Sequence, residues 1–299
     1  MGAAIPSGKA IDCITRLRAR AQAGLRAFSG PLLVLAVLLF VVGGWYSFRQ
    51  LDIAPDELQP IPLALLVATG PITLLYSGIG LYLMSRSVGT AMPLPRSVTL
   101  STYANLAEAL PVPGGAIVRT GALVASGAGL KSSSILVVLS AVLWIAIACL
   151  GCGLALVAHG HPAAFPLSGI GFCGSGLATG WLVARAGWKN ALLTLGHRIA
   201  GMIIISARLH LAFLVMGQAL PLADALPFAL ANVAGSAASI APSGLGISEL
   251  LAAGVASTVA VAPAAAFLAV GVDRLIALAS SGLYVLVAMA VSGRNGTKP

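Results

Sequence analysis

APSGLGISE, residues 241–249, places a proline, two glycines and a carboxylate inside a long run of small and apolar residues. Proline cannot continue a helix, and glycine permits backbone conformations that a side chain would forbid, so the stretch predicts a helix break. An ionisable residue such as Glu249 is costly in an apolar layer unless it is paired or faces a polar interior. We therefore interpret the stretch as a break between two short helices at a cavity.

The composition of the chain is that of an integral membrane protein. Its 299 residues are 59% hydrophobic and 8% charged, with a mean hydropathy of +1.00. Soluble domains carry about 25% charged residues. The apolar blocks are joined by short polar stretches that leave no room for a soluble catalytic domain, so we expect the protein to act in or at the bilayer.

Six apolar blocks are long enough to cross a membrane, which takes about 20 residues. They run near residues 30–48, 60–84, 132–158, 166–184, 199–220 and 263–291. The sequence therefore predicts an all-α polytopic membrane protein with six transmembrane helices.

Two further segments, residues 96–130 and 223–258, are apolar but interrupted by Pro and Gly near their centres. Each could be a kinked pair of crossing helices or a re-entrant hairpin that enters and leaves on one side. Basic residues prefer cytoplasmic connections, and only two hairpins place every basic connection on that side. These connections carry Arg86, Arg96, Lys131, Arg185, Lys189, His197, Arg198, Arg294 and Lys298.

The two broken segments resemble each other at Asn105 and Asn232, at Pro113 and Pro242, and at Gly127 and Gly254. Each half then reads span, span, broken hairpin, span, and the halves start from opposite sides. We therefore expect an inverted repeat, the plan of many secondary transporters. The predicted organisation is a basic amphipathic N-terminal segment (1–29), a first repeat (30–160), a second repeat (161–292) and a tail (293–299).

The formal net charge of +9 is concentrated at the N-terminus rather than on a folded basic face, which argues against nucleic-acid binding. Basic residues crowd before the first block, and apolar residues recur at helical spacing over 10–28. This pattern predicts an amphipathic helix on the cytoplasmic membrane surface. It also places both termini in the cytoplasm.

The breaks suggest how a site could bind an anion. Backbone N–H groups at the start of a half-helix lack intrahelical partners, so they favour phosphate or carboxylate groups. We expect inverted packing to pair Arg119 with Glu249, whereas the adjacent Asp273 and Arg274 point about 100° apart and need different partners. The predicted substrate-binding residues are Asn105, Arg119, Arg208, Asn232, Ser243, Gly244, Gly246, Glu249 and Arg274.

Two of the ionisable residues have open interpretations. Arg208 could contact a headgroup or serve as an anchor whose charged end reaches the membrane surface. His210 could be a packed interior histidine or a proton relay. No residue pattern predicts a catalytic centre, a cofactor or a metal site, because Cys149 and Cys152 have no second ligand pair and the two histidines of HGHP stand alone.

These residues resemble the lysylphosphatidylglycerol synthase transmembrane region, a flippase-like family. Its second motif, Pro-Gly-Gly-Leu-Gly-Val-x-Glu, is matched by Pro242, Gly244, Leu245, Gly246, Ile247 and Glu249, with Ser243 for the first Gly, and its later Arg by Arg274. Its first motif is matched by Asn105, Leu110, Pro111, Gly115 and Arg119. The chain departs from that motif at Pro113 and Ala116, where the family has an Arg and a Glu.

The resemblance implies a lipid flippase or lipid-carrier transporter of the bacterial inner membrane, which moves a lipid with a polar headgroup without acting as an enzyme. The headgroup would belong to an anionic or aminoacylated phospholipid, or to a glycolipid. The expected partner is the lipid itself, with a second copy of the chain or a lipid-synthesis enzyme left open. Three alternatives remain at this point: a transporter of a small anionic solute, an enzyme that modifies headgroups, and a non-catalytic partner of a lipid-modifying enzyme.

Overall fold

The computed structural model describes residues 34–35, 37–52, 57–108, 114–237 and 244–295, and these residues are almost entirely helical, with no strand among them. The predicted N-terminal amphipathic segment, Pro113, Pro242, Ser243 and the end of the tail lie outside the described residues. The prediction of an all-α protein with long apolar helices is confirmed.

After a helix over residues 37–51, the described chain forms nine α-helices and two short 3-10 turns. The α-helices are α2 (Pro60–Ala68), α3 (Gly70–Ser87), α4 (Leu94–Ala107), α5 (Gly114–Ala125), α6 (Leu130–Ala158), α7 (Ala164–Val215), α8 (Leu226–Ala237), α9 (Ile247–Val255) and α10 (Pro263–Asn295). Pro60, Pro95 and Pro263 lie in the first turns of their helices, where proline's fixed φ and missing N–H are tolerated.

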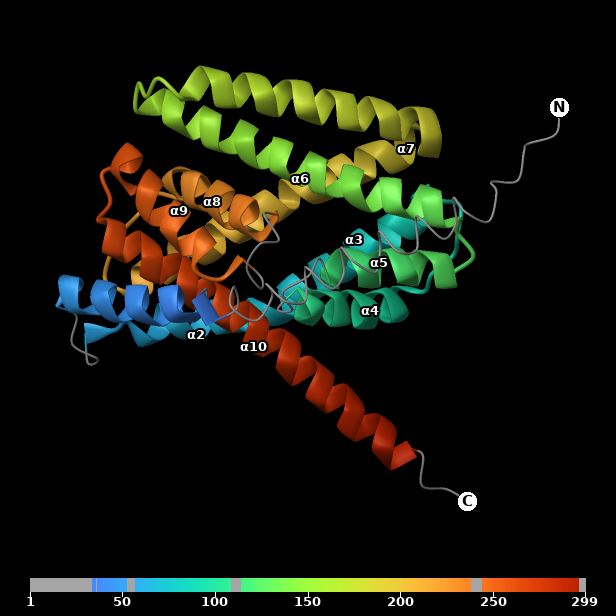
Figure 1. Cartoon of the computed structure of the whole chain (residues 1–299), viewed down its shortest axis with the longest axis horizontal. Coiled ribbons are helices and arrows are strands. Elements are labelled where there is room, and N and C mark those ends of the chain that lie inside the picture. The colour runs from blue at the N-terminus through green and yellow to red at the C-terminus, as the bar shows by residue number, and fades with distance from the viewer. Residues whose placement is uncertain (1–33, 36, 53–56, 109–113, 238–243, 296–299) are drawn as a thin grey trace, which may run out of the picture.

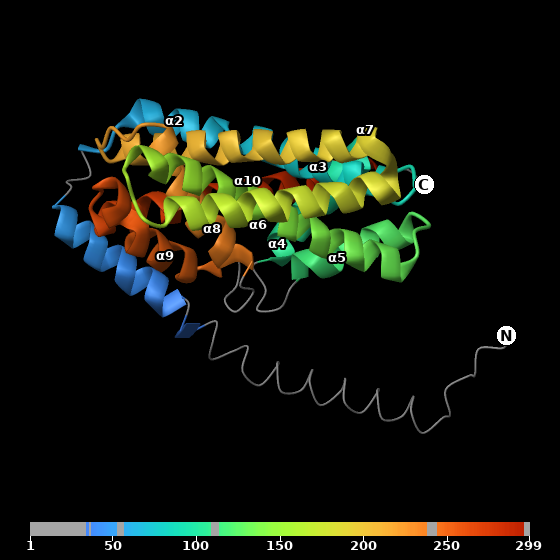
Figure 2. The ribbon, with the colours of Figure 1, turned by 90° about the horizontal axis from the view of Figure 1, so that it is seen from above.

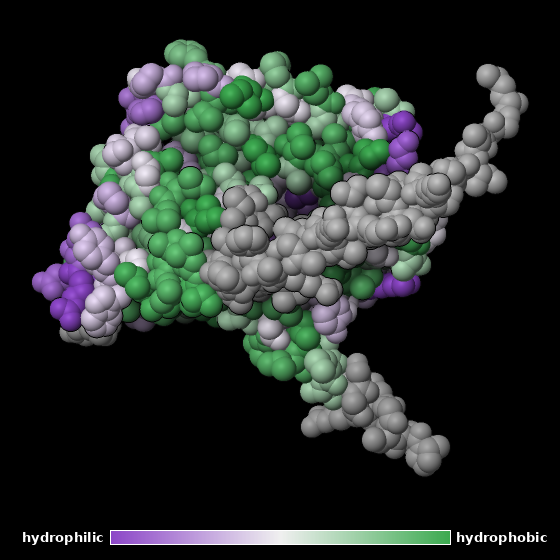
Figure 3. Space-filling model, viewed as in Figure 1, coloured by the Kyte–Doolittle hydropathy of each residue, from purple (hydrophilic) through white to green (hydrophobic). Residues whose placement is uncertain are grey.

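Four helical stretches of the described chain are long and apolar enough to cross a membrane. They are Pro60–Ser87, Leu130–Ala158, Ala164–Val215 and Pro263–Val291. Figure 3 shows a broad hydrophobic surface between hydrophilic residues gathered toward the two ends of the molecule. This distribution is the one expected of a protein whose middle lies in lipid.

Helix α7 is two helices joined at Gly187, whose φ of 80° and ψ of 159° are not helical. Its two arms, residues 164–186 and 188–215, run in opposite directions along α6 (Figure 1). Only glycine adopts such a backbone without strain. The turn is therefore one residue wide, and the assignment of His197 and Arg198 to a loop is wrong, because both lie in the second arm about 15 Å along the helix from the turn.

Both predicted broken segments consist of two short helices in contact with each other, α4 with α5 and α8 with α9. The first pair lies at one end of the molecule and the second pair at the other, with α4 and α8 directed toward the middle (Figures 1 and 2). Gly244 and Gly246 have positive φ of 68° and 78° on the connection between α8 and α9, as the sequence of this stretch requires.

Close packing of α6 against the first arm of α7 depends on small residues. A Cβ atom on Gly171 would clash with backbone atoms of Leu150 and with the carbonyl oxygen of Ala146. Backbone atoms cannot move aside as a flexible side chain can, so this glycine sets the distance between the two helices. By contrast, Gly176 on the same arm has open space around its Cα atom.

We expect Gly171→Ala to destabilise the protein by about 1–3 kcal/mol, because the new methyl group overpacks the α6–α7 contact. Gly176→Ala should be neutral or stabilising by up to about 1 kcal/mol, since alanine favours the helix and meets no neighbour. Thermal unfolding of the purified variants in detergent measures both effects. Equal unfolding temperatures for the two variants would contradict the observed packing.

Candidate functional site

A cavity of about 570 Å³ lies between the two broken hairpins and α3, α6 and the second arm of α7. Residues from both hairpins line it, including Asn105 and Arg119 from the first and Asn232 and Ser236 from the second. Residues of both hairpins therefore line a single cavity. The cavity wall mixes charged and apolar side chains, which a binding site for an amphipathic molecule requires.

The first hairpin holds its own ion pair. Arg119 of α5 lies 2.7 Å from Glu108 at the end of α4, and it donates a second hydrogen bond of 2.9 Å to Asn105. Asn105 in turn donates to Ser77 of α3. The expected pairing of Arg119 with Glu249 is therefore wrong, because a nearer carboxylate on the same hairpin neutralises the guanidinium.

Glu108 also changes the comparison with the first family motif. The chain has Ala116 where the motif has a carboxylate, yet Glu108 supplies a carboxylate to the same hairpin from the other helix. Its side chain lines the cavity and is partly exposed, with Gly115 packed against it. A Cβ atom at Gly115 would collide with the Glu108 side chain, so the glycine makes room for the ion pair.

The second hairpin is held by Arg274 of α10. Its Nη2 donates to Asn232 at 2.7 Å, to Ser248 at 2.5 Å and to Ser236 at 3.3 Å, while its Nε lies 3.7 Å from Glu249. Glu249 is fully buried, so it supplies a compensating negative charge behind the cavity rather than a group on its surface. Arg274 reaches the cavity through Asn232 and Ser236, which line it.

Arg208 and Asp273 form a third buried pair, with Nε and Oδ1 2.7 Å apart. Arg208 also donates to the hydroxyls of Thr69 and Thr73, which places the second arm of α7 against α2, α3 and α10. Asn232 joins this pair to Arg274, because its amide nitrogen lies 3.4 Å from Asp273. The prediction that Asp273 and Arg274 have different partners is confirmed.

Three further predicted residues take structural positions in the described chain. His210 contacts the carbonyl oxygen of Leu220 through Nδ1, as a packed histidine does. Gly246 precedes α9, and Gly244 packs on the backbone of Gly235 and Ser236 in α8, too close for a side chain. The glycines therefore shape the hairpin and do not line the cavity.

The opposite wall of the cavity was not predicted. Tyr76 of α3 stacks on His197 of α7, with ring centroids 4.1 Å apart and planes 15° apart. Arg198 lies over the ring of Trp144, 5.4 Å from its centroid, and donates to Ser140 of α6. Tyr76, Ser140 and Trp144 are isolated polar or aromatic residues in apolar blocks, a weak signal, and the sequence prediction assigns His197 and Arg198 to a loop.

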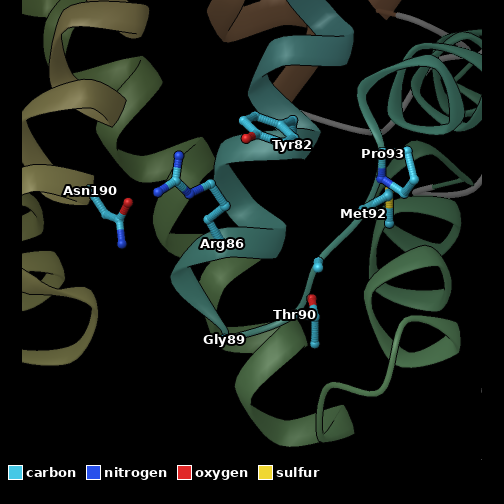
Figure 4. Close-up of a pocket in the computed structure, with 8 residues that line it drawn as sticks. Tyr82, Arg86, Gly89, Thr90, Met92, Pro93 and Asn190 are labelled. Atoms are coloured by element: carbon cyan, nitrogen blue, oxygen red, sulfur yellow. The ribbon is translucent and has the colours of Figure 1, made fainter.

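Two smaller pockets lie at the end of the molecule where α3 ends. Figure 4 shows one of them, of about 540 Å³, with Arg86 and Tyr82 on α3 facing Asn190 on α7. The other, of about 480 Å³, is lined by Lys131 and Arg185. Their basic side chains match the cytoplasmic connections that the sequence predicts. No group of three metal-ligating side chains occurs among the described residues.

We expect Asp273→Asn to destabilise the protein by about 3–5 kcal/mol, because Arg208 would remain buried without its counter-charge. The double variant Arg208→Met with Asp273→Leu should recover most of this loss, since it removes both charges and keeps the volume. The free energy of unfolding is measured in detergent for the single variant, the double variant and the control. Asp224→Asn is the matched control, because Asp224 pairs with the partly exposed His159 and should cost about 1 kcal/mol or less.

Comparison with known proteins leaves the site to be interpreted from its geometry. No family model matches the chain, and no curated protein matches it. The resemblance carried by residues 105–119 and 242–249 is therefore a hypothesis about function.

Proposed function

We propose that the chain is a lipid flippase or lipid-carrier transporter that moves a lipid with an anionic or aminoacylated headgroup between leaflets. In this proposal six helices cross the membrane, and α4–α5 and α8–α9 are re-entrant hairpins of an inverted repeat that enter from opposite sides. The resemblance to the flippase-like family supports the proposal. The protein would lie in a bacterial inner membrane with both termini in the cytoplasm.

The observation that carries the proposal is that the polar cavity shares part of its lining with an apolar groove on the surface of α6. Val138 and Val142 of α6 line the cavity and also line a second pocket of about 340 Å³ between α6 and Trp181 of α7. This second pocket, which we call the apolar groove, is lined by Ser134, Ile135, Val138, Leu139, Val142 and Trp181. Val138 is 63% exposed and Val142 46% exposed on the surface of α6.

A phospholipid needs both surfaces at once. Its headgroup requires polar partners such as Arg119 and Asn105, because a bare charge in hydrocarbon costs about 2.5–3.5 kcal/mol or more. Its acyl chains can remain among apolar side chains, which the apolar groove supplies on the lipid-facing side of α6. A transporter of a small anionic solute needs only the cavity, so the groove favours the lipid.

The charged pairs of the site differ in their exposure to the cavity. Arg208 and Arg274 are compensated by buried carboxylates, and Arg119 by Glu108. Because the Glu108–Arg119 pair is partly exposed in the cavity, an anionic headgroup can compete with Glu108 for Arg119, and a cationic aminoacyl group can compete with Arg119 for Glu108. This pair therefore fits both headgroup classes in the proposal.

The test is lipid exchange by the full chain reconstituted in vesicles. We expect the protein to accelerate exchange of fluorescent phosphatidylglycerol between leaflets, measured by chemical quenching of the outer leaflet. Val142→Trp should slow this exchange about tenfold, equivalent to about 1.4 kcal/mol in barrier height, because the indole fills space at the boundary that the cavity and the groove share. Val157→Trp is the control, since Val157 is exposed on α6 to a similar degree and lines none of the pockets described above.

Equal exchange rates in the Val142→Trp and Val157→Trp proteins would contradict a route through the groove. The proposed function would be contradicted if the protein did not change the exchange rate of any of three lipids: phosphatidylglycerol, an aminoacylated phospholipid and a glycolipid. The comparison is between vesicles with and without the protein. Uptake of radiolabelled glycerol 1-phosphate without any lipid exchange would instead assign the cavity to a small anionic solute.

A further inference from the structure

We propose that Tyr76, His197, Arg198 and Ser140 form a phosphate-binding subsite in the wall of the cavity made by α3, α6 and α7. The subsite rests on the proposed function for its access to lipid, but binding at the subsite can be measured without transport. Its ligand is the phosphate of a lipid headgroup, or of a water-soluble phosphate ester with the same chemistry. The cation at its centre is Arg198.

Arg198 differs from the other charged residues around the cavity. Each of Arg119, Arg208 and Arg274 has a carboxylate partner. Within the described chain, Arg198 has no ion pair, and it contacts the Ser140 hydroxyl, the ring of Trp144 and the Tyr76 hydroxyl. An arginine held between a hydroxyl and an aromatic ring keeps a positive charge that an anion can neutralise.

Two polar atoms of the subsite lack hydrogen-bond partners within the described chain. His197 Nε2 and Arg198 Nε are buried and make no hydrogen bond to any residue that the structure describes, and Tyr76 Oη, also buried, has only the Arg198 guanidinium as an electrostatic partner. Such atoms are rare in proteins, because a buried donor without an acceptor loses its hydration and gains nothing in return. Two of them in one stacked cluster indicate that a ligand, or water in its absence, completes their hydrogen bonds.

The chemistry of the cluster selects an anion rich in oxygen. A guanidinium, a phenolic hydroxyl, an imidazole and a serine hydroxyl can each donate a hydrogen bond. The four residues include no carboxylate, and the nearby carboxylate of Glu108 is already paired with Arg119. Phosphate offers several acceptor oxygens and a negative charge, and arginine recognises it with a planar, forked set of donors.

The position of the subsite fits a lipid. Ser140 lies on α6 two residues from both Val138 and Val142, so its side chain points to another side of the helix, and the cavity lining includes all three residues. A lipid whose phosphate binds at Arg198 would therefore extend across the cavity to reach the groove with its acyl chains. In this arrangement the subsite binds the phosphate, and the Glu108–Arg119 pair contacts the outer part of the headgroup.

The experiment measures binding to the full-length protein in detergent micelles by fluorescence anisotropy. The probe is fluorescent phosphatidylglycerol, and a diacylglycerol with the same fluorophore and acyl chains lacks only the phosphate headgroup. We expect Arg198→Gln to weaken phosphatidylglycerol binding at least about tenfold, the loss of one charge-assisted contact. Diacylglycerol binding should not change. Arg96→Gln is the control, because it removes the same charge from an exposed position on α4.

Two further variants keep the test informative if Arg198→Gln does not fold. Arg198→Lys retains the charge without the forked donors and should bind with intermediate affinity. Tyr76→Phe removes a single hydroxyl and should weaken phosphatidylglycerol binding measurably. Identical phosphatidylglycerol affinities for wild-type, Tyr76→Phe and Arg198→Lys proteins would overturn the subsite, and so would diacylglycerol binding as tight as that of phosphatidylglycerol.

Competition with glycerol 1-phosphate distinguishes the two sources of phosphate. No displacement at millimolar concentration assigns the subsite to lipid, whereas displacement that Arg198→Gln weakens assigns it to a water-soluble ester. Binding that depends on Arg198 without any leaflet exchange would overturn the proposed function and leave the subsite standing. Leaflet exchange with unchanged affinity in Arg198→Gln and Tyr76→Phe would overturn the subsite and leave the function.

Discussion

The compensation of buried charge is the constraint on which this structure depends. Arginine side chains inside an apolar layer must find partners, because each unpaired charge costs about 2.5–3.5 kcal/mol or more. Arg208 meets this requirement through Asp273, and Arg274 through Glu249 and Asn232. These contacts attach the second hairpin, α8 and α9, to α7 and α10. The polar network therefore positions the hairpin whose backbone the Pro and Gly residues interrupt.

Local sequence patterns predicted the all-helical class and the long apolar helices, because apolar blocks and proline positions act within a few residues. They failed at the turn of α7. Arg185, Lys189, His197 and Arg198 looked like one long basic connection, yet a single Gly187 reverses the chain and the following residues return to helix. The charge of Arg198 is tolerated there because Trp144 and Ser140 surround it, and those partners lie more than 50 positions earlier in the chain.

The same limit applies to the candidate site. The sequence predicted Glu249 and Arg274 as site residues, because a charge in an apolar segment needs a partner or a polar interior. It could not predict which charges meet. Glu108 neutralises Arg119 within one hairpin, and the choice between Glu108 and Glu249 is made by tertiary packing alone. The stack of Tyr76 on His197 likewise joins two helices that no local pattern connects.

The distribution of hydrogen bonds around the cavity separates the parts that maintain the fold from the parts that can bind. On the α8 side, Asn232 uses both ends of its amide, toward Arg274 and Asp273, so a ligand there would have to break contacts that hold the hairpin. On the α3 and α7 side, His197 Nε2 and Arg198 Nε have no hydrogen-bond partner within the described chain, and both residues line the cavity. The carboxylate oxygens of Glu249 and Nη1 of Arg274 also lack such a partner, but these two residues are not part of the cavity lining. A ligand gains most where donors are already buried and unsatisfied, because their dehydration has been completed during folding. Binding should therefore begin at the α3–α7 wall, with the second hairpin as its fixed support.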